Sequence, residues 1–195
     1  NYAFQNCAGL TYINIPRNVS SLGTYIFSDC SNLEKVEFEE NSNVTIIPAA
    51  AFYRCTRLKE INIPSSVITI DGVAFGSCRS LKIIYIPSSV TTISAKEYKY
   101  APFYNCSSKL QIYCGASKKQ SGWGTYWNYY NSNTLTTVYN TTEENFHNHS
   151  TKDVVISNGV TTITSSLIQQ YPNMESIFIP NSVTSIDNSA FNGCS

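Results

Sequence analysis

The chain has 195 residues, of which 42% are hydrophobic and 13% are charged, and its 13 Lys or Arg balance 13 Asp or Glu. A net charge of zero without any basic run argues against nucleic acid and against anionic membrane surfaces as partners. No apolar run approaches the roughly 18 residues that a membrane-spanning helix needs, so no membrane insertion is expected. Asn, Ser, Thr and Tyr replace the missing charge, a composition that suits secreted and cell-surface proteins.

The dominant pattern is a 23-residue repeat of apolar anchors, which two consecutive segments show without a gap. Ala51, Phe52, Cys55, Leu58, Ile61, Ile63, Pro64, Val67 and Ile70 recur at the same offset as Ala74, Phe75, Cys78, Leu81, Ile84, Ile86, Pro87, Val90 and Ile93. A fixed period in the twenties predicts a repeat solenoid, in which each coil buries its apolar edge only by stacking on its neighbours.

Further coils appear on both sides of these two segments. Residues 3–22 form a first coil, and residues 26–47 form a second coil with a polar bulge at residues 39–43. The fifth coil gains five residues between Ser94 and Ala101, before Phe103 and Cys106 restore the phase. Ile112 and Cys114 then take the places of Ile84 and Ile86.

The spacing within each coil predicts three elements. Ile-x-Ile-Pro alternates as a strand buried on one face does, and the proline ends it. Val-x-x-Ile predicts a second short strand. Ala-Phe-x-x-Cys-x-x-Leu has the three-residue spacing of a single helical turn, which is too short to be stable without tertiary packing.

Residues 116–152 depart from the repeat. Trp123 and Trp127 lie four residues apart, which predicts a short helix capped by Ser121 with both rings on one face. Residues 134–139 resemble a strand, and residues 141–152 resemble a polar loop. We therefore expect a first array at 1–115, an aromatic insert with a polar loop at 116–152, and a second array at 153–195. These parts are expected to form one continuous solenoid that extends beyond both ends of the chain.

The cysteines follow the repeat. Six of the seven lie three residues after the phenylalanine position: Cys7, Cys30, Cys55, Cys78, Cys106 and Cys194. Equivalent positions in stacked coils lie about 4.8 Å apart with parallel side-chain directions, which fits the dihedral angle of a disulfide poorly. We expect a ladder of small buried thiols, and Tyr171 takes the cysteine position in a later coil. No spacing indicates zinc.

The string Ala-Phe-x-x-Cys-x-x-Leu-x-x-Ile-x-Ile-Pro-x-x-Val-x-x-Ile closely resembles the BspA-type branch of leucine-rich repeats, over residues 1–115 and 154–195. The resemblance implies a leucine-rich-repeat right-handed superhelix, mainly β with short helical turns. It also implies an extracellular or cell-surface setting and adhesion to host proteins or other cells. The family has no shared catalytic residues to transfer.

Outward positions of the Ile-x-Ile strands form two stripes across successive coils. One stripe is Asn14, Glu37, Asn62, Tyr85, Tyr113 and Phe178, and its neighbour is Tyr12, Lys35, Glu60, Ile83 and Ser176. Exposed apolar members would mark an interaction surface, although aromatic residues also favour strands for packing reasons alone. The ligand-binding residues predicted from the stripes are Tyr12, Lys35, Glu60, Asn62, Ile83, Tyr85, Tyr113 and Phe178.

The sequence leaves alternatives to this prediction. Trp123, Tyr126, Trp127 and Tyr130 are suited to stacking on sugars, but the favoured interpretation is that Trp123 and Trp127 plug the open edge of the irregular coil. His147 and His149, with Glu143 and Glu144 nearby, are compatible with a weak metal site or with a solvated loop.

No catalytic motif is present, and we expect neither a cofactor nor a metal. The predicted function is non-catalytic binding of a protein partner, such as a host extracellular protein. The alternatives are binding of a glycan and a role as a structural spacer.

Overall fold

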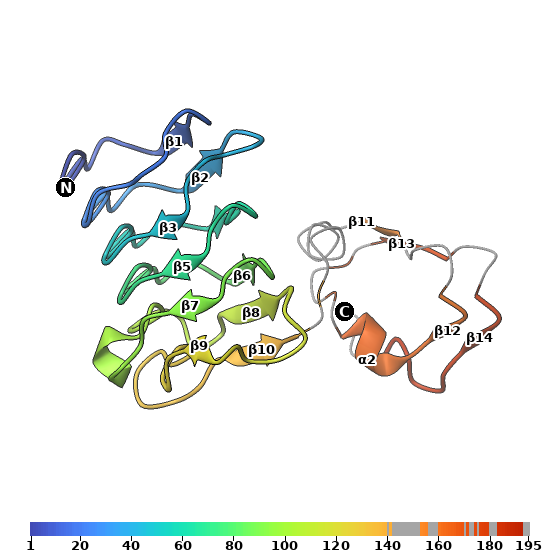
Figure 1. The fold of residues 1–195 in the computed structure, drawn as a ribbon. Coiled ribbons are helices and arrows are strands. Elements are labelled where there is room, and N and C mark those ends of the chain that lie inside the picture. Colours follow the sequence, from blue (N-terminus) through green and yellow to red (C-terminus); the bar gives the residue numbers. More distant parts are fainter. Residues whose placement is uncertain are drawn as a thin grey trace. The chain divides into compact units, whose positions relative to one another are not determined.

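The structure is a computed structural model that describes residues 1–139, 141, 153–155, 160–169, 171, 174, 176–179 and 183–192. The chain forms two compact units, Asn1–Thr141 and Thr142–Ser195. Each unit is built from short parallel strands joined by turns (Figure 1). The division into two arrays with boundaries at residues 115 and 152, and the continuity of the two arrays in one solenoid, stay predictions.

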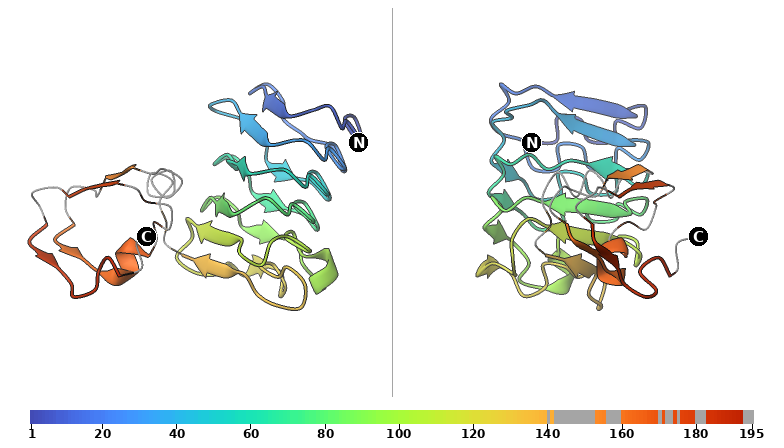
Figure 2. Two further views of the ribbon diagram at one scale, coloured as in Figure 1. Left: turned by 180° about the vertical axis from the view of Figure 1, so that it is seen from behind. Right: turned by 90° about the vertical axis from the view of Figure 1, so that its right-hand side faces the viewer.

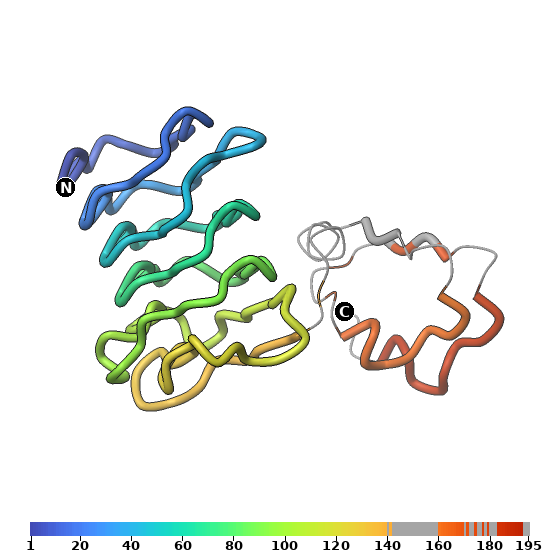
Figure 3. Tube along the Cα trace, in the orientation of Figure 1, coloured from blue at the N-terminus to red at the C-terminus, as the bar shows by residue number. Residues whose placement is uncertain are grey.

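In the first unit, successive coils add one strand to each of two walls. The first wall contains β1 (Tyr12–Ile15), β2 (Lys35–Phe38) and β4 (Glu60–Ile61), then β6 (Ile83–Ile86), β8 (Gln111–Cys114) and β10 (Thr136–Val138). A bridge between Asn62 and Tyr85 connects its two three-stranded parts. The second wall contains β3 (Ile46–Ile47), β5 (Thr69–Ile70), β7 (Thr92–Ile93) and β9 (Gly122–Trp123). The Cα trace shows these coils lying one on another (Figure 3).

The register of the walls follows the sequence repeat. Lys35 pairs with Tyr12 on one side and Glu60 on the other, and Ile70 pairs with both Ile47 and Ile93. Because equivalent residues pair in parallel, each apolar anchor contacts its counterpart in the next coil. The solenoid prediction is therefore confirmed.

The phenylalanines form a column through the interior. Neighbouring rings of Phe4, Phe27, Phe52, Phe75 and Phe103 are stacked with centroids 5.3, 5.5, 5.6 and 5.7 Å apart and interplanar angles of 9–14°. The last four rings are buried. The interior of this solenoid is therefore an elongated core, made of this column and the flanking Leu, Ile, Val and Cys side chains.

The segment between each phenylalanine and the following leucine is a series of β-turns, where the sequence predicted one helical turn. The Cys30 N–H closes a turn onto the Phe27 carbonyl, while the Phe27 N–H donates to Ala51 in the next coil. Alternate N–H groups thus serve the turn and the neighbouring coil, which a helix does not allow. The cost is a left-handed backbone at non-glycine residues such as Asp29 (φ 61°) and Arg54 (φ 59°).

Residues 116–139 continue the coil, where the sequence predicted an insert outside the pattern. Trp123 pairs with Ile93 and occupies the isoleucine position of the second wall, and β10 adds the next strand to the first wall. The helix predicted after Ser121 is therefore wrong, because Trp123 belongs to a strand. The strand predicted within residues 134–139 is confirmed as β10.

The described part of the second unit repeats the same two kinds of pair. β11 (Asp153–Val155) pairs with β13 (Ser176–Phe178), and β12 (Thr162–Ile163) pairs with β14 (Ser185–Ile186). A short helix, α2 (Ser165–Ile168), follows β12 and is capped by the Thr164 hydroxyl. Tyr171 is buried at the cysteine position, as a packing role for that position requires.

Candidate functional site

The outward face of β1, β2 and β4 carries an ordered row of polar side chains. Tyr12, Lys35 and Glu60 lie side by side because their strands pair in register. All three are exposed, whereas the next residues along the strands, such as Val36 and Ile61, point inward and are buried. This alternation is the half-buried strand pattern predicted from the sequence.

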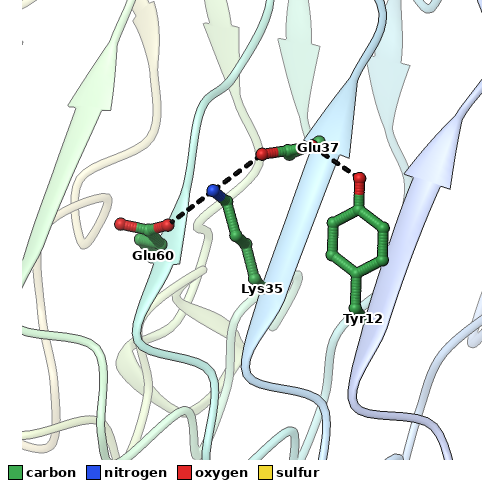
Figure 4. A network of polar contacts seen from close by, with 4 residues as sticks. All are labelled: Tyr12, Lys35, Glu37 and Glu60. Carbon is green, nitrogen blue, oxygen red and sulfur yellow. Dashed lines mark hydrogen bonds and ion pairs between the residues drawn. The ribbon is translucent and has the colours of Figure 1, made fainter.

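A continuous network joins this row to Glu37 (Figure 4). The Tyr12 hydroxyl donates to Glu37 Oε2 at 2.6 Å. Lys35 Nζ lies 2.7 Å from Glu37 Oε1 and 3.2 Å from Glu60 Oε1. We call these four residues, Tyr12, Lys35, Glu37 and Glu60, the charged face.

The hydrogen bonds shift the proton affinities of the charged face in the expected directions. The bond from Lys35 to Glu37 lowers the pKa of the Glu37 carboxyl, and the Tyr12 hydroxyl adds to that effect. Bonds to Glu37 and Glu60 raise the pKa of Lys35, and the bond to Glu37 raises the pKa of Tyr12. Each shift favours the protonation state present at neutral pH. The network is suited to presenting fixed charges for recognition, since Tyr12, Lys35 and Glu37 are all shifted away from exchanging a proton there.

Asparagines and a third glutamate extend the charged face. The Asn14 amide donates to Glu39 Oε1 at 3.3 Å, and Glu39 Oε2 accepts the Arg17 backbone N–H at 3.1 Å. Asn62 is exposed at the end of the same stripe. Asn62 was predicted as a binding residue from its place in the stripe, whereas Glu37, which holds the network together, was not among the predicted binding residues. Glu37 could have been found from the repeat, because it lies between Asn14 and Asn62, two polar residues at the same outward position of the neighbouring coils.

Further along the same wall, the structure corrects the expected exposure of Tyr85 and Tyr113. These side chains are only 6% and 1% exposed, and Ile83 is half-buried. Tyr85 lies across Gly115, where an added Cβ would stand 2.6 Å from the hydroxyl, and it donates to the Thr141 carbonyl at 3.3 Å. Burial raises the pKa of Tyr113 to about 12. Tyr85 and Tyr113 are thus covered.

The last member of the stripe, Phe178, belongs to the second unit. The structure describes its backbone in β13, paired with Val155. Its side chain lies outside the described residues, so its binding role stays a prediction.

The tryptophans pack inside the first unit. Trp123 and Trp127 are 2% and 3% exposed, with ring centroids 4.5 Å apart. The Trp123 indole N–H donates to the Val90 carbonyl at 3.0 Å. In earlier coils a serine hydroxyl serves the equivalent valine, as Ser89 does for Val67. The pair fills the coil as an internal plug, and neither ring is available for stacking on a sugar. Tyr126 and Tyr130 pack partly against the same cluster.

The cysteines form hydrogen bonds that the sequence did not reveal. Each thiol donates to the phenylalanine carbonyl of the preceding coil, at 3.0 Å for Cys30, 3.2 Å for Cys55 and Cys78, and 3.0 Å for Cys106. All are free thiols. Burial raises the pKa of Cys106 and Cys114 to about 12 and that of Cys78 well above its usual value. The predicted ladder of buried thiols is confirmed for Cys30, Cys55, Cys78 and Cys106, whereas Cys7 at its start is only half-buried. Cys194 lies outside the described part of the chain.

Two further features bear on the chemistry that is available. Among the described residues, no group of three or more His, Cys, Asp or Glu side chains is placed to hold a metal ion. His147 and His149 lie outside those residues. None of the helices described is long and apolar enough to cross a membrane.

Comparison with known proteins places this architecture in a family. The chain matches the family model described as "BspA type Leucine rich repeat region", with 6 copies, over residues 1–109 and 99–195. No curated protein matches the chain significantly.

Solved structures of leucine-rich repeat proteins are similar to this chain at low sequence identity. A leucine-rich repeat protein from T. pallidum is 22% identical with a TM-score of 0.51, and the match covers 100% of this chain and 68% of that one. A leucine rich cell surface protein from Faecalibacterium prausnitzii is 21% identical with a TM-score of 0.44, covering 93% and 57%. A leucine-rich repeat protein from Bacteroides ovatus is 19% identical with a TM-score of 0.36, covering 99% and 67%. This chain thus spans between 57% and 68% of the lengths of these three.

Proposed function

The chain belongs to the BspA type leucine-rich repeat family, and from that premise we propose that it is a non-catalytic protein-binding module that uses the charged face. The supporting observation is the network of Tyr12, Lys35, Glu37 and Glu60 across three adjacent strands. The face is exposed, while Tyr85 and Tyr113 of the predicted stripe are buried.

The fixed arrangement of the charged side chains favours binding more than it favours folding. Exposed ion pairs contribute only about 0–1 kcal/mol each to folding, so the network does little for stability. However, side chains that are already held in one arrangement lose less conformational entropy when a partner docks. Fixed charges on a firm sheet also reject partners with the wrong charge pattern, which gives specificity.

The proposed setting is extracellular or at a cell surface, where the partner would be another extracellular protein. The low share of charged residues and the many Asn, Ser, Thr and Tyr residues support this setting. The repeat family supports it as well, because its members are known in such settings.

Binding to a panel of purified, immobilised extracellular proteins tests the proposal. The informative variants are Glu37→Gln and Lys35→Met, because each breaks the network without opening the core. A protein that the wild-type chain binds should lose at least tenfold in affinity with either variant. Lys109→Gln is the matched control, since Lys109 is exposed elsewhere on the first unit, and it should bind as the wild type does. Equal binding by all four proteins would refute the charged face as the site, and a chain that binds nothing in the panel would favour the spacer alternative.

A further inference from the structure

Two insertions into the repeat meet at one corner of the first unit, after the second wall. The first is residues 94–101, which contain the short 3-10 helix η1 (Tyr98–Tyr100), and the second is residues 124–133. The Tyr126 N–H donates to the Ala95 carbonyl at 3.3 Å. A Cβ added at Gly124 would lie 2.7 Å from the same oxygen, so only glycine permits this approach. Figure 1 and the left panel of Figure 2 show η1 beside the loop that follows β9.

Both insertions are rich in tyrosine. Tyr98 and Tyr100 are 45% and 54% exposed, and Tyr100 is the most exposed of the large hydrophobic side chains among the described residues. The rings of Tyr98 and Tyr104 lie 6.4 Å apart, and those of Tyr126 and Tyr129 meet edge to face at 5.0 Å. We call these five residues, Tyr98, Tyr100, Tyr104, Tyr126 and Tyr129, the tyrosine edge.

The first insertion is anchored at both ends. Ser94 donates from its backbone to Ile70 at 2.9 Å and from its hydroxyl to Asp71 Oδ1 at 2.9 Å. At the other end, the Tyr100 carbonyl accepts the Val73 N–H at 3.2 Å. A surface that is already ordered gives up less conformational freedom when a ligand docks.

The charge of the surrounding coils is strongly asymmetric. Residues 71–141 hold seven Lys or Arg side chains and only two acids, Asp71 and Glu97. All seven cations are exposed, and Lys99 alone among them forms an ion pair within the described structure, with Glu97 at 3.3 Å. Since Asp71 accepts the Ser94 hydroxyl, both acids are already engaged. The remaining positive field attracts an anionic partner.

We propose that the tyrosine edge binds an acidic polysaccharide. Its sugar rings would stack on Tyr98 and Tyr100, because the C–H faces of a pyranose complement the negative face of an aromatic ring. Its uronic acid carboxylates would pair with Lys96 and with Lys99 in the same insertion. Lys99 lies between the two tyrosines in sequence and would exchange its exposed ion pair with Glu97 for the ligand. An acidic peptide offers less flat apolar surface to the rings. Single-stranded nucleic acid needs a continuous basic groove, whereas these cations are mostly dispersed along the sequence.

Electrophoresis of the whole chain through gels that contain polygalacturonate tests the proposal, with dextran as the neutral polymer. The wild-type chain should be retarded by polygalacturonate and not by dextran. Tyr98→Ser with Tyr100→Ser, and separately Lys96→Gln with Lys99→Gln, should each weaken the interaction at least tenfold. Tyr2→Ser is the matched control, because Tyr2 is 52% exposed and belongs neither to the charged face nor to the tyrosine edge, and it should migrate as the wild type does. Unchanged urea midpoints would establish that the variants are folded.

Three outcomes would overturn the proposal. The first is no retardation of the wild-type chain by polygalacturonate. The second is retardation that survives loss of both tyrosines, which would mean charge attraction alone. The third is equal retardation by polyglutamate or by oligo(dT), which would assign the edge to acidic peptides or to nucleic acid. The variants do not touch the charged face, so this proposal and the protein-binding function can fail independently.

Discussion

Replacement of Phe52 by alanine tests the column of stacked rings at its centre. Phe52 is fully buried and stacks on Phe27 at 5.5 Å and on Phe75 at 5.6 Å. A buried Phe→Ala change costs about 3–5 kcal/mol, and each aromatic pair adds about 0.5–1.5 kcal/mol beyond burial. We expect a loss at the upper end of the first range, about 5 kcal/mol. Phe4→Ala is the matched comparison, since Phe4 is 41% exposed and stacks on Phe27 alone, and we expect it to cost about 2 kcal/mol.

Urea unfolding followed by two signals measures both the cost and its location. Far-ultraviolet circular dichroism reports all coils, whereas fluorescence reports Trp123 and Trp127, the two tryptophans of the chain. Coils in a solenoid are coupled mainly to their neighbours, so a weak joint at Phe52 should let the preceding coils unfold first. The gap between the two midpoints should therefore widen in Phe52→Ala relative to the wild type. Equal costs for the two variants, or a Phe52→Ala cost below about 1.5 kcal/mol, would refute the reasoning.

Three further predictions follow from single contacts. Burial raises the pKa of the Cys106 thiol to about 12, so the folded state keeps a proton that the unfolded state releases above about pH 8.5. The contribution of this thiol to the free energy of unfolding is complete below that pH and is lost toward pH 12, at about 1.4 kcal/mol per pH unit. The urea midpoints measured at pH 7.5 and pH 10 should therefore differ less in Cys106→Ala than in the wild type. An unchanged difference between the two midpoints would contradict this. Arg54 has a positive φ of 59°, so Arg54→Gly should raise the free energy of unfolding by about 1 kcal/mol. Arg57→Gly, without a positive φ, should lower it, and the same sign for both would refute the strain argument. Trp123→Phe should cost about 1–3 kcal/mol because it leaves the buried Val90 carbonyl without its indole donor; urea unfolding would contradict this with a loss below about 0.5 kcal/mol.

The architecture was predictable because the same apolar anchors recur at one spacing. Phe52 and Phe75 occupy equivalent positions, and a parallel stack is the arrangement that buries both. The turns were not predictable from spacing, since three residues between Phe27 and Cys30 fit a helical turn and a β-turn equally well. The β-turn forms because alternate N–H groups donate to carbonyls of the next coil. That contact joins residues distant in sequence, so local spacing does not reveal it.

The candidate surfaces were predictable only in part. Alternation correctly predicted that Lys35 and Glu60 are exposed, but it also predicted that Tyr85 is exposed. Tyr85 is buried, and its hydroxyl donates to the carbonyl of Thr141, which is far away in sequence. Trp123 was not recognised as a replacement for isoleucine because its size hid the repeat. Tyr98 and Tyr100 carried a usable signal, namely five residues added to a coil that otherwise keeps its length.

The thiol ladder determines how the first unit would behave in an oxidising environment. Reaction with a disulfide requires an accessible thiolate, and Cys30, Cys55, Cys78, Cys106 and Cys114 are all shielded from solvent. Cys7 is half-buried and is the one cysteine that reagents can reach in this unit. A single Cys7→Ser change would therefore make the unit inert toward alkylating agents while it stays folded. With Cys194 of the second unit also replaced, one cysteine introduced on the charged face or the tyrosine edge would carry a probe at a unique position, and either surface could be mapped by labelling.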